Sequence, residues 1–154
     1  METQGTHFPV LAACVHRTQG PVLELGAGDY STPLLHLLCK GRTLVTVESN
    51  PEWLKLFKDT ENENHKLILV KNYDEAKIID EVNWDVALVD HAPGPRRVTE
   101  IKRLQDRARF IVVHDTDDPG YHYEPVLATF TYRFDYKRWR RWVAVVSMFE
   151  PFVP

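Results

Sequence analysis

Short apolar runs alternate with segments of helical periodicity along almost the whole of this 154-residue chain. Near-continuous apolar runs are typical of strands that are buried on both faces of a parallel sheet. Five such runs precede helix-like segments, and they span 21–25, 43–47, 66–70, 84–89 and 110–113. Right-handed crossovers between these strands would place helices on both faces of the sheet. The pattern predicts a doubly wound α/β three-layer sandwich in one domain, residues 1–154.

The segments between and after these strands complete the expected architecture. A short helix is predicted at 8–17, and further helices at 73–82, 96–107 and 124–129. Ser31 or Thr32 is expected to cap the second helix, which should bury the leucines of 34–38, and Asn50 is expected to cap the third. Two final runs, 132–136 and 142–148, have no helix between them, which predicts an antiparallel hairpin. The sheet should therefore hold about seven strands, mostly parallel.

Composition excludes several classes of protein. The chain has 44% hydrophobic and 27% charged residues and a net charge of −3, which is typical of a globular protein rather than of a general polyanion binder. Cys14 and Cys39 stand among apolar residues without a metal-binding spacing, which favours reduced cysteines in a cytoplasmic protein. No apolar run approaches the ~20 residues of a membrane span, so no membrane partner is expected. Residues 1–7 carry no basic n-region, so no secretory signal is expected either.

The loop after the first strand carries two glycines, in Gly26-Ala27-Gly28-Asp29-Tyr30-Ser31-Thr32. Gly26 allows a sharp turn out of the strand, and Gly28 lets a ligand approach the backbone. Glu48 ends the second strand 20 positions after Gly28, where a carboxylate can accept hydrogen bonds from ribose hydroxyls. Ligands of open α/β sheets bind at this edge, so the pattern predicts a nucleotide-like ligand there.

Charge in this loop distinguishes between such ligands. A dinucleotide fingerprint places a third small residue where Ser31 stands and leaves a pyrophosphate on the helix N-terminus. Asp29 would repel that pyrophosphate, and Glu24 adds a second negative charge at the entrance to the loop. Two carboxylates suit a ligand that carries an ammonium and a sulfonium. The loop therefore argues against a nucleotide-dependent dehydrogenase.

Glu24-Leu25-Gly26-Ala27-Gly28 resembles motif I of class I S-adenosylmethionine-dependent methyltransferases. Glu48 matches the acidic residue that closes their second strand, Asp74 resembles the position that meets the adenine amino group, and 84–90 resembles their fourth-strand motif. The resemblance implies a Rossmann-like fold with strand order 3-2-1-4-5-7-6 and S-adenosyl-L-methionine as cofactor. The cofactor-binding residues that it implies are Glu24, Gly26, Ala27, Gly28, Ser31, Thr32, Glu48, Ser49, Tyr73, Asp74, Asp90 and His91.

Candidate catalytic residues follow the fourth and fifth strands. An oxygen nucleophile must lose its proton to a base or to a metal ion, and Asp90, His91 and His114 are the candidates for this role. Asp90 and Asp115 end adjacent strands, so their carboxylates could share one divalent cation. Asp90-His91 together with an aspartate after strand five is similar to the catechol-type, magnesium-dependent O-methyltransferases. Thr116 stands where that family has an amide ligand, so Mg²⁺ is retained only as a hypothesis.

The acceptor of the methyl group leaves more alternatives open. No Asn/Asp-Pro-Pro-Tyr/Phe or Pro-Cys motif follows strand four, which argues against amino-group and cytosine C5 methylation. The leading hypothesis is O-methylation of a small hydroxylated acceptor, with pocket walls from the N-terminal helix, the 115–124 loop with its aromatic residues, or a second subunit of a homo-oligomer. A nucleic acid or protein substrate is the first alternative, and a non-catalytic cofactor-binding module is the second. In the nucleic-acid case Trp139 would stack on a base, and the phosphate contacts would come from Arg96, Arg97, Lys137, Arg138, Arg140 and Arg141.

Overall fold

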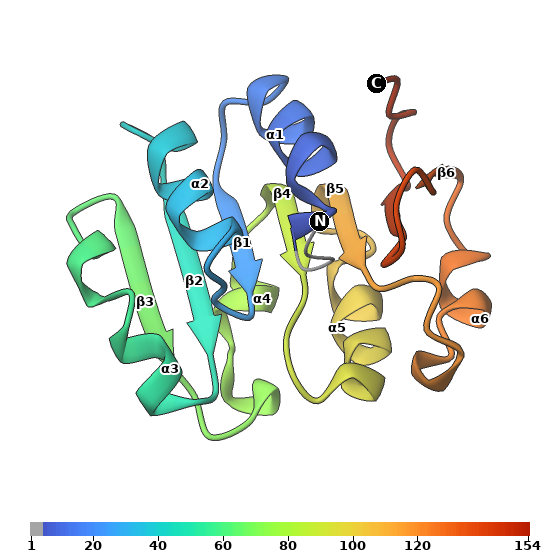
Figure 1. Ribbon diagram of the computed structural model, residues 1–154. Helices are drawn as coiled ribbons and strands as arrows, with labels where there is room; N and C mark the ends of the chain where they lie inside the picture. Colours follow the sequence, from blue (N-terminus) through green and yellow to red (C-terminus); the bar gives the residue numbers. More distant parts are fainter. Residues whose placement is uncertain (1–4) are drawn as a thin grey trace.

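The computed structural model describes residues 5–154, whose seven strands form one sheet with the order β3-β2-β1-β4-β5-β7-β6 (Figure 1). The strands are β1 Val22–Leu25, β2 Leu44–Glu48, β3 His65–Leu69, β4 Trp84–Val89, β5 Ala108–His114, β6 Tyr132–Tyr136 and β7 Val143–Ser147. The first five are parallel to one another, and β7 lies antiparallel to both β5 and β6. The predicted mostly parallel sheet with a reversed C-terminal hairpin is confirmed.

The helices are short and lie on both faces of this sheet (Figure 1). They are α1 Phe8–His16, α2 Ser31–Leu38, α3 Pro51–Lys55, α4 Ile78–Glu81, α5 Arg97–Leu104 and α6 Glu124–Leu127. Four single 3₁₀ turns join them to the strands: η2 Lys58–Thr60, η3 Tyr73–Glu75, η4 Gly94–Arg96 and η5 Pro119–Tyr121. None of the helices within residues 5–154 has the length and apolarity that crossing a bilayer requires.

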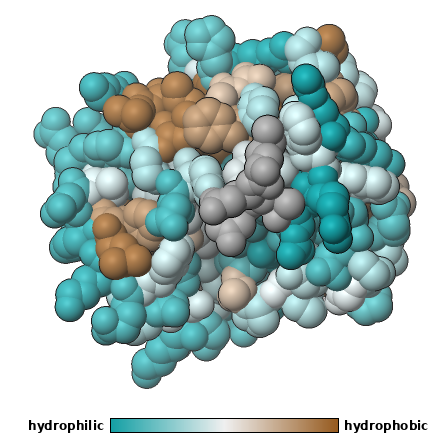
Figure 2. Space-filling view, viewed as in Figure 1, coloured by the Kyte–Doolittle hydropathy of each residue, from teal (hydrophilic) through white to brown (hydrophobic). Residues whose placement is uncertain are grey.

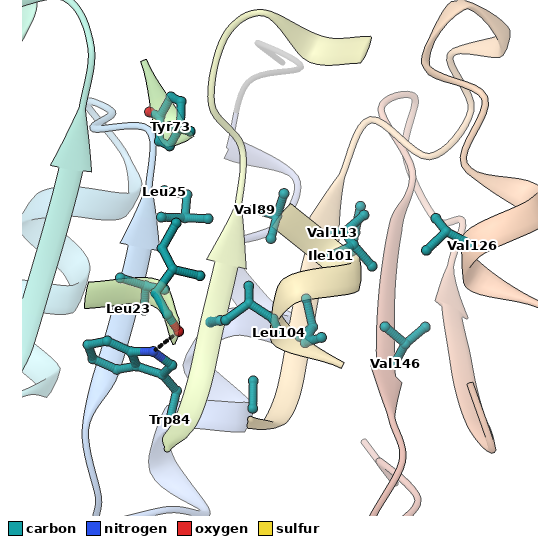
Figure 3. Close-up of a cluster of buried hydrophobic side chains, with 14 of the residues drawn as sticks. Leu23, Leu25, Tyr73, Trp84, Val89, Ile101, Leu104, Val113, Val126 and Val146 are labelled. Atoms are coloured by element: carbon teal, nitrogen blue, oxygen red, sulfur yellow. Dashed lines mark hydrogen bonds between the residues drawn. The ribbon is translucent and has the colours of Figure 1, made fainter. Parts of the chain in front are cut away.

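Alternate residues of each strand point to opposite faces, so the two large core clusters lie on the two faces of the sheet. Leu23 and Leu25 belong to the cluster that includes Ile101 and Leu104 of α5, whereas Val22 packs in the cluster of α1 and α2. Figure 3 shows the first cluster, in which the indole Nε1–H of Trp84 donates to the carbonyl of Ile79 at 3.3 Å. Burial on both faces explains why the strand residues are apolar at consecutive positions, as the sequence predicted.

Helix α2 departs from its predicted cap and buried face. The hydroxyls of Ser31 and Thr32 do not cap the helix, because both donate to the buried Glu24 of β1. Of its leucines only Leu35 is fully buried, and Leu37 and Leu38 are 62% and 40% exposed. Figure 2 shows apolar side chains gathered over α2. The leucines of α2 are spread around more of the helix than the one face that packs on the sheet, so some of them remain exposed.

The helix that was predicted at 73–82 is interrupted. Residues 73–75 form the 3₁₀ turn η3, whose start is capped by Asn72, and α4 begins only at Ile78. Ala76 between them has ψ 68°, which is outside the helical region. The predicted helix at 96–107 also differs, since η4 precedes it and α5 ends at Leu104. The cap of α3 is as predicted, because Asn50 accepts a hydrogen bond from the amide of Trp53 at 3.1 Å.

Candidate functional site

A pocket of about 300 Å³ opens at the carboxyl ends of β1, β4 and β5. This edge is the point where the strand order reverses about β1, which is where ligands of open α/β sheets bind. The loop after β1, together with Trp53 of α3, forms one wall, and the ends of β4 and β5 form the opposite one. The lining residues are His7, Gly28, Asp29, Tyr30, Ser31, Trp53, Asp90, His114, Asp115, Tyr121 and Arg141.

The two glycines of the loop serve different purposes. Gly26 has φ 91°, and a Cβ atom there would lie 2.7 Å from the carbonyl oxygen of Asp90 and 2.7 Å from Cα of His91. Gly26 therefore permits the loops after β1 and β4 to touch, rather than the close approach of a ligand. At Gly28 a Cβ would lie 3.1 Å from Oγ of Ser31, and both residues line the pocket. Only Gly28 has the position that a ligand contact requires.

Glu48 anchors the glycine loop through its carboxylate. One carboxylate oxygen accepts from the amide of Ala27 at 3.0 Å, and the other accepts from the amides of Ser49 and Asn50 at 2.7 and 2.8 Å. The indole Nε1–H of Trp53 donates to the carbonyl of Ala27 at 2.6 Å, which fixes the same peptide from the other side. The prediction that Glu48 also binds ribose hydroxyls stays a prediction.

Glu24 lies beneath the loop and does not line the pocket. Its carboxylate is fully buried and accepts hydrogen bonds from Ser31 at 2.5 Å, Thr46 at 2.6 Å and Thr32 at 3.0 Å. The hydroxyl of Thr32 in turn accepts from the amide of Gly28 at 2.9 Å. Burial raises the pKa of Glu24 to about 7, although the three hydroxyl donors act in the opposite direction. Glu24, which was expected to place a negative charge at the entrance to the loop, therefore supports the loop from beneath and does not face the pocket.

Three residues expected at the cofactor lie outside the pocket. Tyr73 is buried, donates to the carbonyl of Val47 at 3.2 Å, and packs its ring 4.0 Å from the ring of His91. Nε2 of His91 lies 3.0 Å from a carboxylate oxygen of Glu100, so its ring turns away from the pocket. Asp74 is 73% exposed and forms an ion pair with Arg96 at 2.5 Å. Their proposed contacts with the cofactor remain predictions.

Asp90 and His114 meet in the pocket wall, as expected for residues that end adjacent strands. Nδ1 of His114 lies 3.1 Å from Oδ1 of Asp90, and Nε2 of His114 lies 2.9 Å from the hydroxyl of Thr6. That hydroxyl donates to the carbonyl of Arg141 at 2.6 Å. Burial alone would raise the pKa of Asp90, but His114 and Arg97 outweigh it and hold the pKa below its usual value. The carboxylate of Asp90 is therefore ionised and positioned at the pocket.

Arg97, the first residue of α5, occupies the position at which the sequence predicted a metal ion. Its Nη2 lies 3.1 Å from Oδ1 of Asp90, its Nη1 lies 3.2 Å from Oδ2 of Asp115, and its Nε donates to the carbonyl of His91 at 2.6 Å. A guanidinium already neutralises both carboxylates, so a magnesium ion shared by Asp90 and Asp115 does not fit this arrangement. The sequence suggested Arg97 as a phosphate contact for a nucleic-acid substrate, whereas its side chain is buried.

His7 is a second residue that the sequence did not single out. It precedes α1, is 2% exposed, and packs edge-to-face on His114 with ring centroids 4.7 Å apart. Neither of its ring nitrogens has a hydrogen-bond partner among the described residues. Burial lowers the pKa of His7 to about 4, so the ring is neutral at physiological pH. No local motif marks His7, because its neighbours come from segments distant in sequence.

The loop after β5 supplies the last wall. Tyr121 lines the pocket, and its ring packs against Gly94, where a Cβ would lie 2.3 Å from the ring. Tyr123 is buried and donates to the carbonyl of His114 at 3.2 Å, whereas His122 is exposed. Tyr121, His122 and Tyr123 are the aromatic residues of the 115–124 loop that were expected at this wall, and of these only Tyr121 lines the pocket.

Comparison with solved structures identifies the fold of this chain. No protein-family model and no curated protein matches the chain. A candidate caffeoyl-CoA O-methyltransferase from Staphylococcus aureus superposes with a TM-score of 0.73 at 12% identity, over 94% of this chain and 83% of that one. Human methyltransferase-like protein 13, in complex with SAH, gives 0.72 at 16% identity, over 94% and 82% of the two chains. An rRNA methylase from Streptococcus thermophilus gives 0.63 at 16% identity, over 96% and 99%. The fold is that of a class I S-adenosylmethionine-dependent methyltransferase.

This methyltransferase fold brings only part of the predicted site together. Gly28, Ser31, Asp90, His114 and Asp115 share one pocket, although they come from three separate loops. The remaining predicted residues hold the loops in place, as Glu24 and Glu48 do, or lie outside the pocket. The chain folds so that the glycine loop after β1 faces the ends of β4 and β5 across the pocket.

Proposed function

We propose that this chain is an S-adenosylmethionine-dependent methyltransferase that methylates an oxygen of a small hydroxylated acceptor. One observation carries the proposal: the glycine loop and the Asp90–His114 pair line opposite walls of one pocket at the switch point of the sheet. In this fold such a pocket is the place where a bound donor would meet its acceptor. The O-methyltransferase among the structural neighbours supports this choice of acceptor atom.

The residues present fit such a cofactor at its amino-acid end. S-adenosylmethionine supplies a methyl group on a sulfonium, which is already activated for displacement. Asp29 and Asp90 place carboxylates in the pocket wall, which suits a ligand with positive charges and opposes a pyrophosphate. Glu48 would meet the ribose, because a carboxylate has about four acceptor positions and three are used by backbone amides.

The chain's own contribution to the reaction is mainly positioning. Holding reactants in line supplies a large part of the barrier reduction in such displacements. An acceptor hydroxyl beside Asp90 can donate its hydrogen bond to the carboxylate, which Arg97 and His114 hold in place. Asp90 and His114 are accordingly the residues to which we assign the binding and deprotonation of the acceptor. Tyr121 and Arg141 would bound the acceptor on its outer side.

Titration calorimetry with S-adenosylhomocysteine and with NAD tests the proposal. The parent should bind S-adenosylhomocysteine more tightly than NAD, and Gly28→Val should lose that binding, because its side chain would fill the space beside Ser31. Tighter binding of NAD, or full affinity in a folded Gly28→Val protein, would contradict the site. A panel of hydroxylated acceptors with labelled cofactor then separates an enzyme from a cofactor-binding module, which would bind without turnover.

A nucleic-acid substrate is the second candidate, and it is favoured by the β6–β7 turn. Lys137 lies over the ring of Trp142 and Arg138 over the ring of Trp139, and the two indoles are 36% and 39% exposed. Arg141 of the same turn lines the pocket. Aromatic rings beside cations are a surface that single-stranded nucleic acid can use. Steep salt dependence of oligonucleotide binding, together with weaker binding by Trp139→Ala, would favour this candidate over the small acceptor.

A further inference from the structure

His7 is the most unusual polar group in the described part of the chain. A buried polar atom normally has a hydrogen-bond partner. Both ring nitrogens of His7 lack one, although the side chain is 2% exposed and borders the pocket. Its ring packs on His114, so its nitrogens lie close to the Asp90–His114 pair. A neutral imidazole without partners in such a place is suited to ligand binding.

The hydrogen bonds of His114 provide the second observation. The hydroxyl of Thr6 donates to the carbonyl of Arg141, so it can only accept from Nε2–H of His114. In the neutral ring Nδ1 then carries a lone pair, and it lies 3.1 Å from the carboxylate oxygen of Asp90. Arg97 supplies a cation to this oxygen of Asp90 at 3.1 Å, whereas the lone pair on Nδ1 of His114 would be left without a donor.

The geometry of the three side chains fits a metal ion. One ligand atom from each of His7, Asp90 and His114 lies within 4.8 Å of the other two. Ligand atoms about 2.0–2.1 Å from a tetrahedral Zn²⁺ lie about 3.3 Å from one another. The 3.1 Å between His114 and Asp90 already matches this separation, and a ring nitrogen of His7 lies within 4.8 Å of both.

We propose that His7, His114 and Asp90 bind one divalent cation of the kind that imidazole nitrogen favours, with Zn²⁺ as the reference ion. Two imidazoles and one carboxylate leave at least one coordination position open, as in catalytic zinc sites. The hydrogen bond from Nε2–H of His114 to Thr6 orients that ligand from outside the site. This site differs from the predicted Asp90–Asp115 pair, which Arg97 holds.

The surrounding charges are compatible with a divalent ion. Asp90 and Asp115 are the nearby carboxylates, whereas Arg97 and Arg141 are the nearby cations that oppose the ion. Metal binding requires an imidazole nitrogen with a free lone pair, and neither ring nitrogen of His7 is engaged by a hydrogen bond among the described residues. With an ion bound, Asp90 and His114 would act on the acceptor hydroxyl through the ion rather than directly. For this catalytic role, though not for metal binding, the inference rests on the proposed function.

Calorimetric titration of the chelator-treated full chain with Zn²⁺ tests the proposal. The parent should bind one equivalent, and Mg²⁺ should not compete. His7→Phe, which keeps a ring of similar size, should weaken binding more than about tenfold, and Thr6→Val should weaken it by about 10–100-fold, because it removes the outer partner of a ligand. His16→Ala, on the exposed end of α1, is the matched control and should bind like the parent.

A second pair of imidazoles provides the decisive contrast. Nδ1 of His36 lies 3.1 Å from Nδ1 of His65, so His36→Ala must also be titrated. Unchanged affinity in a folded His7→Phe, loss of binding in His36→Ala, or no stoichiometric binding by the parent would each overturn the proposal. If His7→Phe does not fold, Asp90→Asn replaces it in the same titration. S-adenosylhomocysteine titrations of the same samples separate a failed metal site from a failed cofactor site.

Discussion

The guanidinium of Arg97 lies 3.2 Å from the carboxylate of Asp115, and both side chains are buried at the end of β5. The same guanidinium lies 3.1 Å from Asp90 on the neighbouring strand. A basic residue thus supplies the positive charge that two adjacent strand-end carboxylates need. This arrangement separates the chain from proteins in which a hard cation such as magnesium has that role.

Arg97→Met should destabilise the protein strongly, because it removes the buried guanidinium that pairs with the buried Asp115 and the partly buried Asp90. Breaking a buried ion pair by removing one member costs about 3–5 kcal/mol. The free energy of unfolding in urea measures the loss. Arg109→Met is the control, since the Arg109–Glu150 pair is largely exposed and such pairs contribute about 0–1 kcal/mol.

The effect of magnesium on stability shows whether Asp90 and Asp115 are held by Arg97 or bind a metal ion. In the parent, millimolar Mg²⁺ should leave the melting temperature unchanged, because Arg97 holds both side chains. In Arg97→Met the same ion should raise it, since the carboxylates become available. An increase in the parent as large as in the variant would show that Arg97 does not fill the site.

The sheet could be predicted from sequence because strands buried on both faces must be apolar at consecutive positions. The limits of β4 and β6 agree with the prediction at both ends, and the strand order follows the resemblance. The helices were less predictable because helical periodicity shows which residues can share a face, not how much of that face is covered. Leu37 fits the apolar pattern of α2 and is nevertheless exposed.

The site was only partly predictable for a related physical reason. Gly26, Gly28 and Glu48 carry local requirements of one turn and one strand end, which a motif records. His7 and Arg97 meet their partners across the fold, at separations of 107 residues to His114 and 18 residues to Asp115. Nothing in the local sequence distinguishes a buried arginine at the start of a helix from a solvated one.

Gly26→Ala should be far more destabilising than Gly41→Ala. Both glycines have positive φ, 91° and 78°, so an alanine is strained at either position. A Cβ at position 41 meets nothing within 4 Å, whereas at position 26 it would lie 2.7 Å from backbone atoms of the β4 loop. We expect a loss of about 1–2 kcal/mol for Gly41→Ala and a larger one for Gly26→Ala. Equal losses in urea unfolding would show that the two loops can separate freely.

Glu24 should make the protein less stable as the pH rises. Burial raises its pKa in the folded state from 4.5 to about 7, so the folded protein retains a proton that the unfolded chain releases. The stabilisation is complete below pH 4.5 and is lost as the pH rises to about 7, with a total of about 3 kcal/mol. Glu24→Gln should lack this slope.

The quantity to measure is the difference between the unfolding free energies of the parent and of Glu24→Gln as a function of pH. The pKa values of His7 and His65 are lowered to about 4, mainly by burial, so these groups add stability as the pH rises from 4 to 6.5 and oppose Glu24. Subtracting the Glu24→Gln unfolding free energies from those of the parent removes that contribution. A difference that stays constant from pH 4.5 to 7 would mean that Glu24 is ionised throughout. The exposed Glu52→Gln serves as control.

Glu48→Gln should reduce both stability and affinity for S-adenosylhomocysteine. The substitution keeps the shape of the side chain, but its amide nitrogen must face one or two of the three backbone N–H groups that the carboxylate now accepts. An unsatisfied buried donor costs about 1–3 kcal/mol, and the charge-assisted bonds that remain become weaker. The amide of Ala27 should then leave its position, and the loop that frames the pocket moves with it, so affinity should fall at least tenfold. Urea unfolding and calorimetry on the same preparation separate the two roles of Glu48. Lower affinity at unchanged stability would assign the carboxylate to the ribose alone, whereas lower stability at unchanged affinity would make it only an anchor of the loop.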